Sequence, residues 1–506
     1  MFHGRRLFKA VIFFILGDII ALLCPSVVFF ICFISAITLF GVVAFSRLNK
    51  YKYMQKYFAF FAFGLVLGAL FSSFVLSSFR VYEGSQTKIK GYVTEVNTIN
   101  ETITISVKEE KLFPFRFNAK LYSDEKSISS LKKGDGVEVV VDCGKVSNNI
   151  YLLADRCYIQ GNIVELSKCD VDIGFFDSLF ISVRAAIEDS LTNALGKTDE
   201  GALAISILVG DQTGISKGLK TAFKVTGTSH YLSISGLHFS LIVLLTYFVV
   251  MRTTSNYKAA CIISIIVIFL YMPIPSFTPP VIRSAFISIF LFVTKLLKLK
   301  SDTVTSMSLS LFIIMLFNPA AILSVGLQLS YIATFGIIYS DIVTPELSLE
   351  NRHGSVMQRF SRYVQLSFKV STLALIFTTP IVVLTFGEFS LFSPLFNVIL
   401  SPLFSIVLVC SLIIAFISFI FPILSLYIVW FFELPLKIFN KLIELFGNVP
   451  SILIHTDGTF TKILTYLLAF AVFIAILTHK KKRENDGKIF LFLVWGSVII
   501  ASLLGF

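Results

Sequence analysis

The sequence predicts a polytopic α-helical membrane protein with a small β-barrel of the OB type inserted after the third membrane span. Apolar residues make up 56% of the 506 positions, and 54 residues are phenylalanine. That composition leaves too little polar surface to cover a soluble globule. Apolar runs long enough to cross a bilayer recur along the chain and give about 11–13 candidate spans. One stretch near the N-terminus instead alternates apolar and polar residues, as strands do.

The N-terminal region, residues 1–79, is predicted to hold three spans. Its first apolar run follows "MFHGRRLFK" directly, and a second run comes next without a small-residue cleavage site. We therefore interpret the first run as a retained span and not as a signal peptide. Short loops rich in Lys and Arg, such as "SRLNKYKYMQK", "KLLKLK" and "THKKKR", are expected on the cytoplasmic side. This rule predicts a cytoplasmic N-terminus and places residues 80–200 outside. It also explains the net charge of +12 as an orientation signal.

Residues 80–170 are predicted to form the extracytoplasmic barrel. Alternating segments such as "KIKGYVTEV", "ETITISVK" and "GDGVEVVV" indicate about five short strands, which suits a small closed barrel. Barrels of this type often bind single-stranded nucleic acid on exposed aromatic side chains. Phe113, Phe115 and Phe117 fall on one face of a strand. We expect these rings to fill the barrel core or, alternatively, to form a stacking surface.

The barrel also holds the candidate disulfide of the chain. Cys143 and Cys157 lie in segments predicted to be adjacent strands, and an oxidising exterior permits a bond between them. Cys169 makes the number of cysteines in this region odd, so unpaired thiols are the alternative.

A predicted amphipathic helix, residues 171–200, leads into the main membrane region, residues 201–480. Apolar residues at helical spacing in "FFDSLFISVRAAIEDSLTNAL" predict a helix that lies along the outer membrane surface. Beyond it, "GDQTG" interrupts an apolar run that is too short to span. The segment 227–238, "GTSHYLSISGLH", then puts two histidines and three serines at the start of the next span. Glycine-rich, irregular backbone at membrane depth needs protein or a water-filled cavity to satisfy its amides, so we expect a functional site here.

Four motifs in this region resemble, in order, those of the ComEC competence family, inner-membrane channels through which bacteria take up transforming DNA. They are "ILVGDQTGISKGLKTAFKVTGTSHYLSISGLHFSLIV", "FTPPVIRSAFI", "SVGLQLSYIATFGII" and "TPIVVLTFGEFSLFSPLFNVILSPL". The three-span start and the barrel also resemble the N-terminal half of that family. The resemblance implies a multi-pass protein of the bacterial cytoplasmic membrane that passes one DNA strand through the lipid bilayer. It also implies a DNA receptor, a cytoplasmic helicase and a separate nuclease as partners.

The sequence departs from many members of that family at its C-terminal end. Those members carry a metallo-β-lactamase-type nuclease domain with metal ligands in the pattern His-x-His-x-Asp-His. This chain has six histidines, and none lies within two positions of another, so we expect no metal site of that kind. Residues 481–506 are predicted to be a basic loop and a last span. We therefore expect no cofactor and no enzyme activity in this chain. We expect another polypeptide to degrade the DNA strand that is not transported.

Six residues are candidates for lining the DNA path, and each also has a structural interpretation. Arg283 is expected either to contact phosphate or to extend towards the lipid headgroups. Gln328 lies in mid-span, where an amide lines a pore or hydrogen-bonds another helix. Asp211 has Lys217 or Lys220 as a possible ion-pair partner. The remaining candidates are His230, Ser235 and His238.

The two histidines and Ser235 leave room for other classes of function. Both histidines are expected to be hydrogen-bonded packing residues or to line the path. Ser235 beside a histidine also suggests an intramembrane hydrolase, but no acid near them in the sequence orients either ring. A transporter of a small or lipid-linked substrate, built on a broken-helix site, is the other alternative.

Overall fold

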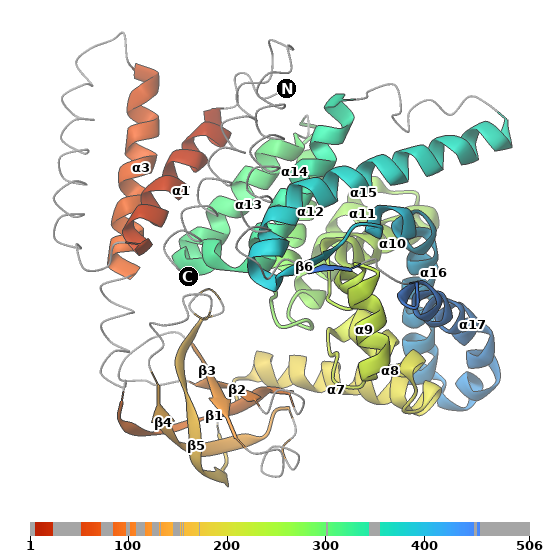
Figure 1. Ribbon diagram of the computed structural model, residues 1–506, viewed down its shortest axis with the longest axis horizontal. Helices are drawn as coiled ribbons and strands as arrows, with labels where there is room; N and C mark the ends of the chain where they lie inside the picture. The colour runs from red at the N-terminus through yellow and green to blue at the C-terminus, as the bar shows by residue number, and fades with distance from the viewer. Residues whose placement is uncertain are drawn as a thin grey trace. The chain divides into compact units, whose positions relative to one another are not determined.

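The structure is a computed structural model of the chain, and it divides into two compact units. The first unit is Met1–Ile181, Ser301–Leu327 and Ile476–Phe506, and the second is Ser182–Lys300 and Gln328–Ala475. Figure 1 shows the elements of both units. The structure describes residues 6–23, 52–71, 84–97, 102–107, 117–123, 131, 133–144, 152, 154, 156–171, 173–299, 302–343, 355–449 and 453–455. The predicted last span therefore lies outside the described residues.

Five strands in the first unit form a closed barrel (Figure 1). They are β1 (Gln86–Asn97), β2 (Thr102–Val107), β3 (Phe117–Tyr122), β4 (Gly136–Cys143) and β5 (Cys157–Lys168). Their order around the barrel is β1-β2-β3-β5-β4; β3 and β5 pair in parallel, and the other pairs are antiparallel. Five strands closed in this way are consistent with the predicted OB-like domain.

Alternating side chains of the strands fill the barrel. Val137, Val139 and Val141 of β4 point inwards and are fully buried, while the residues between them are partly exposed. Phe117 belongs to the same core, with 2% of its surface exposed. The Phe117 ring is therefore part of the barrel core, which was one of the two expectations. Phe113 and Phe115 lie outside the described residues.

The structure does not bring Cys143 and Cys157 together. Cys143 at the end of β4 pairs with Gly161 of β5, four positions after Cys157. At about 3.3 Å per residue, this offset is about 13 Å along the strand, whereas a disulfide needs Cα atoms within about 7 Å. Both thiols are buried and neither is in a disulfide. Burial raises the pKa of the Cys143 thiol above its ordinary value.

Three helices of the first unit pack together beside a short 3-10 turn. They are α1 (Arg6–Leu23), α3 (Lys52–Phe71) and α13 (Thr303–Phe317), and the turn is η6 (Pro319–Leu323). The end of α13 is bonded to the barrel, because the Asn318 side-chain amide donates to the Ala154 carbonyl over 2.8 Å and Arg156 donates to the Phe317 carbonyl over 3.4 Å.

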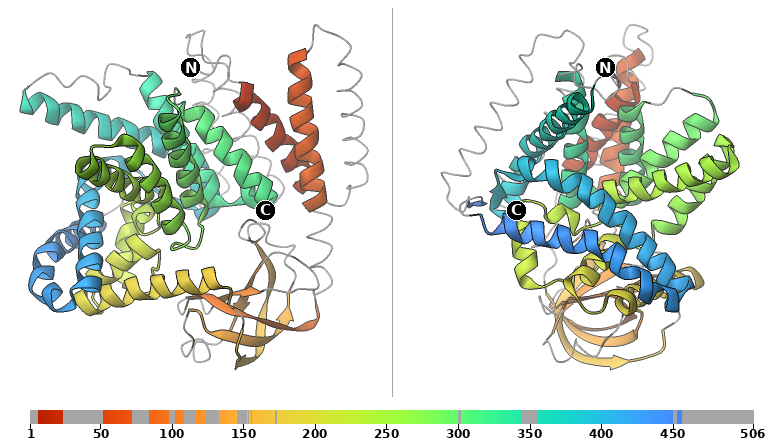
Figure 2. Two further views of the ribbon diagram at one scale, coloured as in Figure 1. Left: turned by 180° about the vertical axis from the view of Figure 1, so that it is seen from behind. Right: turned by 90° about the vertical axis from the view of Figure 1, so that its right-hand side faces the viewer.

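In its described residues, the second unit is helical apart from one two-stranded ribbon. Its helices are α8 (Asp199–Val209), α9 (Lys217–Val225), η5 (Ser229–Tyr231), α10 (Gly236–Thr254), α11 (Tyr257–Tyr271), α12 (Pro279–Leu296), α15 (Val356–Phe386), α16 (Ser393–Ile420) and α17 (Pro422–Gly447). The ribbon pairs β6 (Glu388–Ser390) with β7 (Leu453–His455). Helix α14 (Val325–Val343) lies almost wholly in this unit, and α16 and α17 pack side by side (Figure 2).

Four of the described helices are long and apolar enough to cross a membrane: α10, α12, α15 and α16. With the barrel, they confirm the predicted class, a helical membrane protein with a small β domain. The predicted 11–13 spans also include segments outside the described residues. Helix α7 (Phe175–Leu195) begins with Phe175 and Phe176, whose side chains are 76% and 70% exposed. Its place along the membrane surface stays a prediction.

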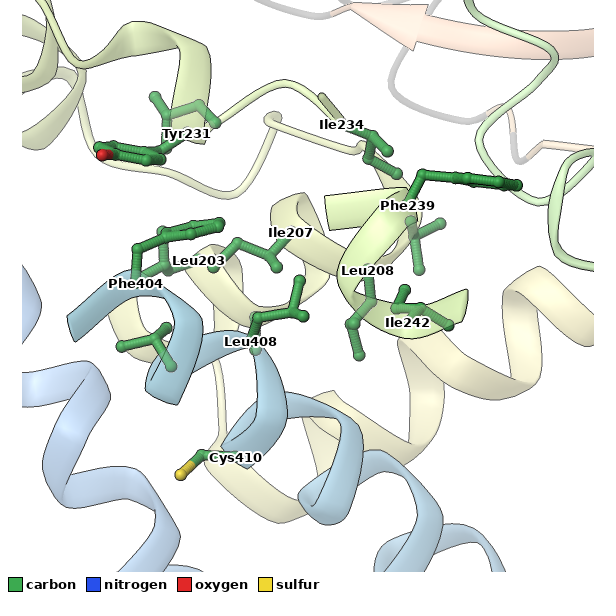
Figure 3. Packing of buried hydrophobic residues seen from close by; sticks show 14 of the residues in the cluster. Leu203, Ile207, Leu208, Tyr231, Ile234, Phe239, Ile242, Phe404, Leu408 and Cys410 are labelled. Carbon is green, nitrogen blue, oxygen red and sulfur yellow. The ribbon is translucent and has the colours of Figure 1, made fainter. Parts of the chain in front are cut away.

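The core of the second unit joins α8, α10 and α16 (Figure 3). Leu203 and Ile207 of α8 and Phe404 and Leu408 of α16 are all buried in it. The ring of Tyr231, from η5, stacks on Phe404 with 4.5 Å between ring centroids. The short segment between α9 and α10 is thereby fixed to the long helix α16.

Candidate functional site

The candidate site is built on residues 227–238, which join α9 to α10. Helix α9 ends at Val225, and Gly227 then adopts a φ of +70°, which favours glycine. A Cβ at Gly227 would lie 2.8 Å from the Cβ atoms of Ser390 and Ser393, so no larger residue fits. The chain makes the short turn η5 and enters α10 at Ser235.

Ser235 and His238 close the N-terminus of α10. The Ser235 backbone N–H donates to His238 Nδ1 over 2.9 Å, so Nδ1 is an acceptor and the proton of the neutral ring sits on Nε2. Nε2 then donates to the Tyr231 carbonyl over 3.3 Å. Ser235 Oγ lies 2.6 Å from Nδ1 and accepts from the Leu237 N–H. His238 has no exposed surface, and every polar atom of its ring has a partner. This is a helix cap of the capping-box kind.

His230 does not join His238. Its side chain is exposed, and its ring rests against Tyr231 with 4.2 Å between centroids. Among the residues that the structure describes, no group of three or more His, Cys, Asp or Glu side chains could hold a metal ion. The two histidines therefore occupy different surroundings, one buried in a cap and one at the surface.

A chain of hydrogen bonds links this segment to the start of α16. Tyr231 donates its hydroxyl proton to Asn397 Oδ1 over 3.0 Å, and the Asn397 amide donates to Ser393 Oγ over 3.3 Å. Ser393 Oγ in turn donates to the Gly227 carbonyl over 3.3 Å. Sequence reasoning did not single out Ser393 or Asn397, although both lie in the fourth family motif, "FSPLFNVILSPL".

Arg283 is a buried cation on α12. This helix begins with Pro279 and Pro280 at its first positions, which suits proline, and Arg283 follows within the first turns. Only 8% of Arg283 is exposed. Its Nη1 donates to Thr334 Oγ1, its guanidinium carbon lies 5.8 Å from the centre of the Tyr331 ring, and its Nε has no hydrogen-bond partner. No carboxylate of the described residues pairs with it.

Gly236 brings the start of α10 against Arg283. A Cβ at Gly236 would lie 2.4 Å from Arg283 Nη2 and 2.5 Å from Ser284 Oγ. Only a glycine allows this approach, since real Cβ atoms do not come so close to another atom. On α14, Gln328 is half-buried and lies one helical turn before Tyr331. Arg283, Gly236 and α14 thus meet in one place.

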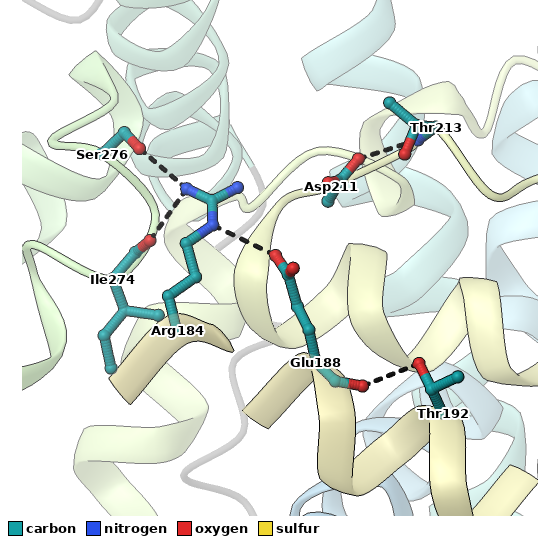
Figure 4. A network of polar contacts seen from close by, with 7 residues as sticks. All are labelled: Arg184, Glu188, Thr192, Asp211, Thr213, Ile274 and Ser276. Carbon is teal, nitrogen blue, oxygen red and sulfur yellow. Dashed lines mark hydrogen bonds and ion pairs between the residues drawn. The ribbon is translucent and has the colours of Figure 1, made fainter. Parts of the chain in front are cut away.

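Asp211 lies apart from this group, in the loop that follows α8. Gly210 ends α8 in the left-handed region, with a φ of +86°, and Asp211 Oδ1 accepts from the Thr213 N–H over 2.9 Å (Figure 4). Burial lowers the pKa of Lys220, and the nearby Asp211 carboxylate partly offsets that effect. An ion pair of Asp211 with Lys217 or Lys220 stays a prediction.

Figure 4 also shows a polar network around Arg184 of α7. Arg184 forms an ion pair with Glu188 at 3.2 Å. It also donates to the Ser276 hydroxyl over 2.9 Å and to the Ile274 carbonyl over 3.3 Å. These bonds connect α7 to the loop between α11 and α12. Arg283 lies in α12, shortly after this loop. Sequence reasoning missed this anchor.

The arrangement is suited to holding an anion and poorly suited to hydrolysis. Ser235 contacts a histidine, but the other nitrogen of that ring faces a backbone carbonyl, and no carboxylate of the described residues orients it. Arg283, in contrast, is a desolvated cation with an unused N–H at Nε. Such a group lacks a counter-charge, which an anionic ligand would supply.

Comparison with known proteins adds the family context. A sequence model described as the competence protein family matches residues 207–482, more than half of the chain. ComE operon protein 3 of Bacillus subtilis (strain 168) is 25% identical over 262 residues, which are 52% of this chain and 32% of that protein. The match thus spans about a third of the length of that relative. No solved structure matches the chain.

Proposed function

Since the chain belongs to the competence protein family, we propose that it forms the passage by which one strand of transforming DNA crosses the cytoplasmic membrane. The matched region contains the segment 227–238, Arg283 and Gln328, so the family assignment and the candidate site coincide. The proposal includes the predicted orientation, with the N-terminus in the cytoplasm and residues 80–200 outside.

The observation that carries the proposal is the buried guanidinium of Arg283. A cation removed from water is costly unless an anion accompanies it. A DNA phosphate is such an anion, and a planar guanidinium binds it through two parallel N–H bonds. Nε and an Nη nitrogen form the edge that makes this contact, and Nε has no partner among the residues that the structure describes.

A path for a long polyanion must bind each phosphate weakly enough to release it. A few separated cations among hydroxyl and amide groups serve this purpose better than a dense basic ring. Arg283 is surrounded by Thr334, Tyr331 and the backbone of Gly236. We assign contact with DNA to Arg283, Gln328 and the exposed His230. Ser235 and His238 hold the start of α10, and Asp211 shapes the preceding loop.

The barrel is proposed to receive DNA before it enters the membrane. Its β1–β4 face carries little excess charge, because Lys88 and Lys90 both pair with Glu138 at 2.8 Å. Contact there would rest on stacking and hydrogen bonds more than on a basic patch. A DNA receptor, a cytoplasmic helicase and a separate nuclease complete the proposed system, in which this chain has no nuclease role.

The test is transformation by cells whose own copy of the gene is replaced by an Arg283→Gln variant. Losing one charge-assisted bond of about 1.5–3 kcal/mol should reduce uptake about ten- to a hundredfold. Arg283→Lys should restore part of it. The control is Arg252→Gln, which removes an exposed arginine at the other end of α10. Immunoblots must show equal protein levels. Wild-type uptake of labelled DNA by Arg283→Gln would remove Arg283 from the path and favour the small-substrate transporter.

A further inference from the structure

Asp18 is a carboxylic acid buried inside the predicted first span. It lies in the second turn from the end of α1, and none of its surface is exposed. Neither carboxyl oxygen has a hydrogen-bond partner in the described part of the chain. An ionisable side chain within a membrane segment is costly, and such residues commonly mark ion or proton sites. Nothing in the proposed DNA path uses this group.

Three glycines bring α1 and α3 so close that Asp18 is enclosed between them. A Cβ at Gly17 would lie 2.2 Å from the Phe61 carbonyl oxygen, and one at Gly64 would lie 2.0 Å from that of Phe14. A Cβ at Gly68 would lie 2.7 Å from Asp18 Oδ1. Gly64 and Gly68 are four apart, the spacing of the small residues that let membrane helices approach closely. Because contacts advance in the same sense along both helices, α1 and α3 run parallel.

Among the described residues, the other elements packed against α1 are apolar near Asp18. Phe14, one turn before it, meets Phe312 of α13 edge-on at 5.0 Å between centroids. Neither α13 nor η6 carries a titratable side chain. The titratable residues of α1 and α3 occur earlier in each helix, and Asp302 precedes α13. Those on the two helices are Arg6, Lys9, Lys52, Tyr53, Lys56 and Tyr57.

We propose that Asp18 is a proton-binding site, which keeps its proton while α1 and α3 are in contact and releases it to water only when they separate. The step is a plain acid dissociation, in which the carboxyl O–H bond breaks and the proton passes to water. An ionised carboxylate in this enclosed position would have neither a hydrogen-bond donor nor a counter-charge among the described residues. Contact between the two helices is therefore linked to proton occupancy. This inference is independent of the proposed DNA passage.

The first test is carboxyl labelling of the full-length protein in lipid vesicles. A lipid-soluble carbodiimide, which reacts with protonated carboxyls in apolar surroundings, is applied from pH 6 to pH 9, and the modified peptides are identified by mass spectrometry. Asp18 should be labelled at the lower end of this range and become protected as the pH rises. Glu165, exposed on the barrel, is the internal control and should react only with a water-soluble carbodiimide. Absence of Asp18 labelling at every pH would overturn the proposal.

Two variants make the result specific. Asp18→Asn, a neutral mimic of the protonated acid, should fold, resist labelling and have a melting temperature that changes less with pH than that of the wild type. Gly68→Ala forces a methyl group against Oδ1 and should let water reach Asp18, which shifts its labelling to lower pH. Its control is Gly218→Ala, at a helical glycine with no atom within 4 Å of the added Cβ. Identical pH profiles of melting for the wild type and Asp18→Asn would contradict a proton site.

Discussion

Gly236 lies directly against the guanidinium of Arg283, so close that a Cβ at Gly236 would be 2.4 Å from Nη2. This contact joins the start of α10 to α12, and Arg283 continues it to α14 through Thr334. The position of the buried cation therefore depends on the absence of a side chain at residue 236.

Gly236→Ala is expected to displace Arg283 without removing its charge. The added methyl group must push Nη2 or Ser284 Oγ away, which breaks the alignment of Arg283 with Thr334. Transformation should fall by about tenfold, the equivalent of about 1.4 kcal/mol. Gly218→Ala serves as the control, because that position has open space. Normal transformation by Gly236→Ala would show that the placement of Arg283 is unimportant.

Ser235→Ala is expected to lower the thermal stability of the protein and to leave DNA uptake per folded molecule unchanged. Loss of the cap costs about 1 kcal/mol, and the Leu237 N–H loses its acceptor. Thermal unfolding in detergent should show the loss, and uptake per folded molecule should match the wild type. Loss of uptake at unchanged thermal stability would instead favour the intramembrane hydrolase.

The barrel thiols are expected to be reduced and slow to react. Burial raises the pKa of Cys143, so a smaller fraction is thiolate at pH 8 than for an ordinary cysteine, and alkylation should need a higher pH or unfolding. Peptide mapping after alkylation without reductant measures both points. The half-buried Cys169 provides the comparison within the same chain. A linked Cys143–Cys157 peptide would contradict the strand register.

The ion pairs of Glu138 give the barrel a defined pH response. Hydrogen bonds from Lys88 and Lys90 lower the pKa of Glu138, so the folded barrel holds this proton less tightly than the unfolded chain. The resulting stability is fully present above the unfolded value of about 4.3 and is lost as the pH falls through the lower folded value. Glu138→Gln should therefore melt below the wild type at pH 7, and the difference should disappear towards pH 3. An equal difference at both pH values would exclude these ion pairs as its cause.

Much of the fold could be predicted because it rests on local patterns. Alternation in "GDGVEVVV" predicted β4, and apolar length predicted the spans at α10, α12, α15 and α16. The cysteine pairing could not be predicted, since it depends on the register between β4 and β5, which sequence alternation leaves undetermined. The enclosure of Asp18 could not be predicted either, because it depends on how the glycines of α3 pack against α1.

The location of the candidate site could be predicted from the sequence, but the role of each residue in it could not. The motif 227–238 indicated Ser235 and His238, but only the geometry shows that His238 Nδ1 accepts from the Ser235 backbone and acts as a cap. Arg283 was expected to contact phosphate or to extend towards the lipid headgroups. Thr334 and Gly236 surround it because α10, α12 and α14 converge, and no local spacing encodes that convergence.

If a DNA strand passes beside Arg283, cross-linking during uptake should capture it there. A photoreactive amino acid at position 334, whose native threonine bonds Arg283, is activated while cells take up end-labelled DNA. We expect a covalent adduct with single-stranded DNA from position 334, and none from position 244, where Leu244 is an exposed apolar residue of α10. Equal adducts from both positions, or none from position 334 in a variant that still transforms, would show that the strand does not pass beside Arg283.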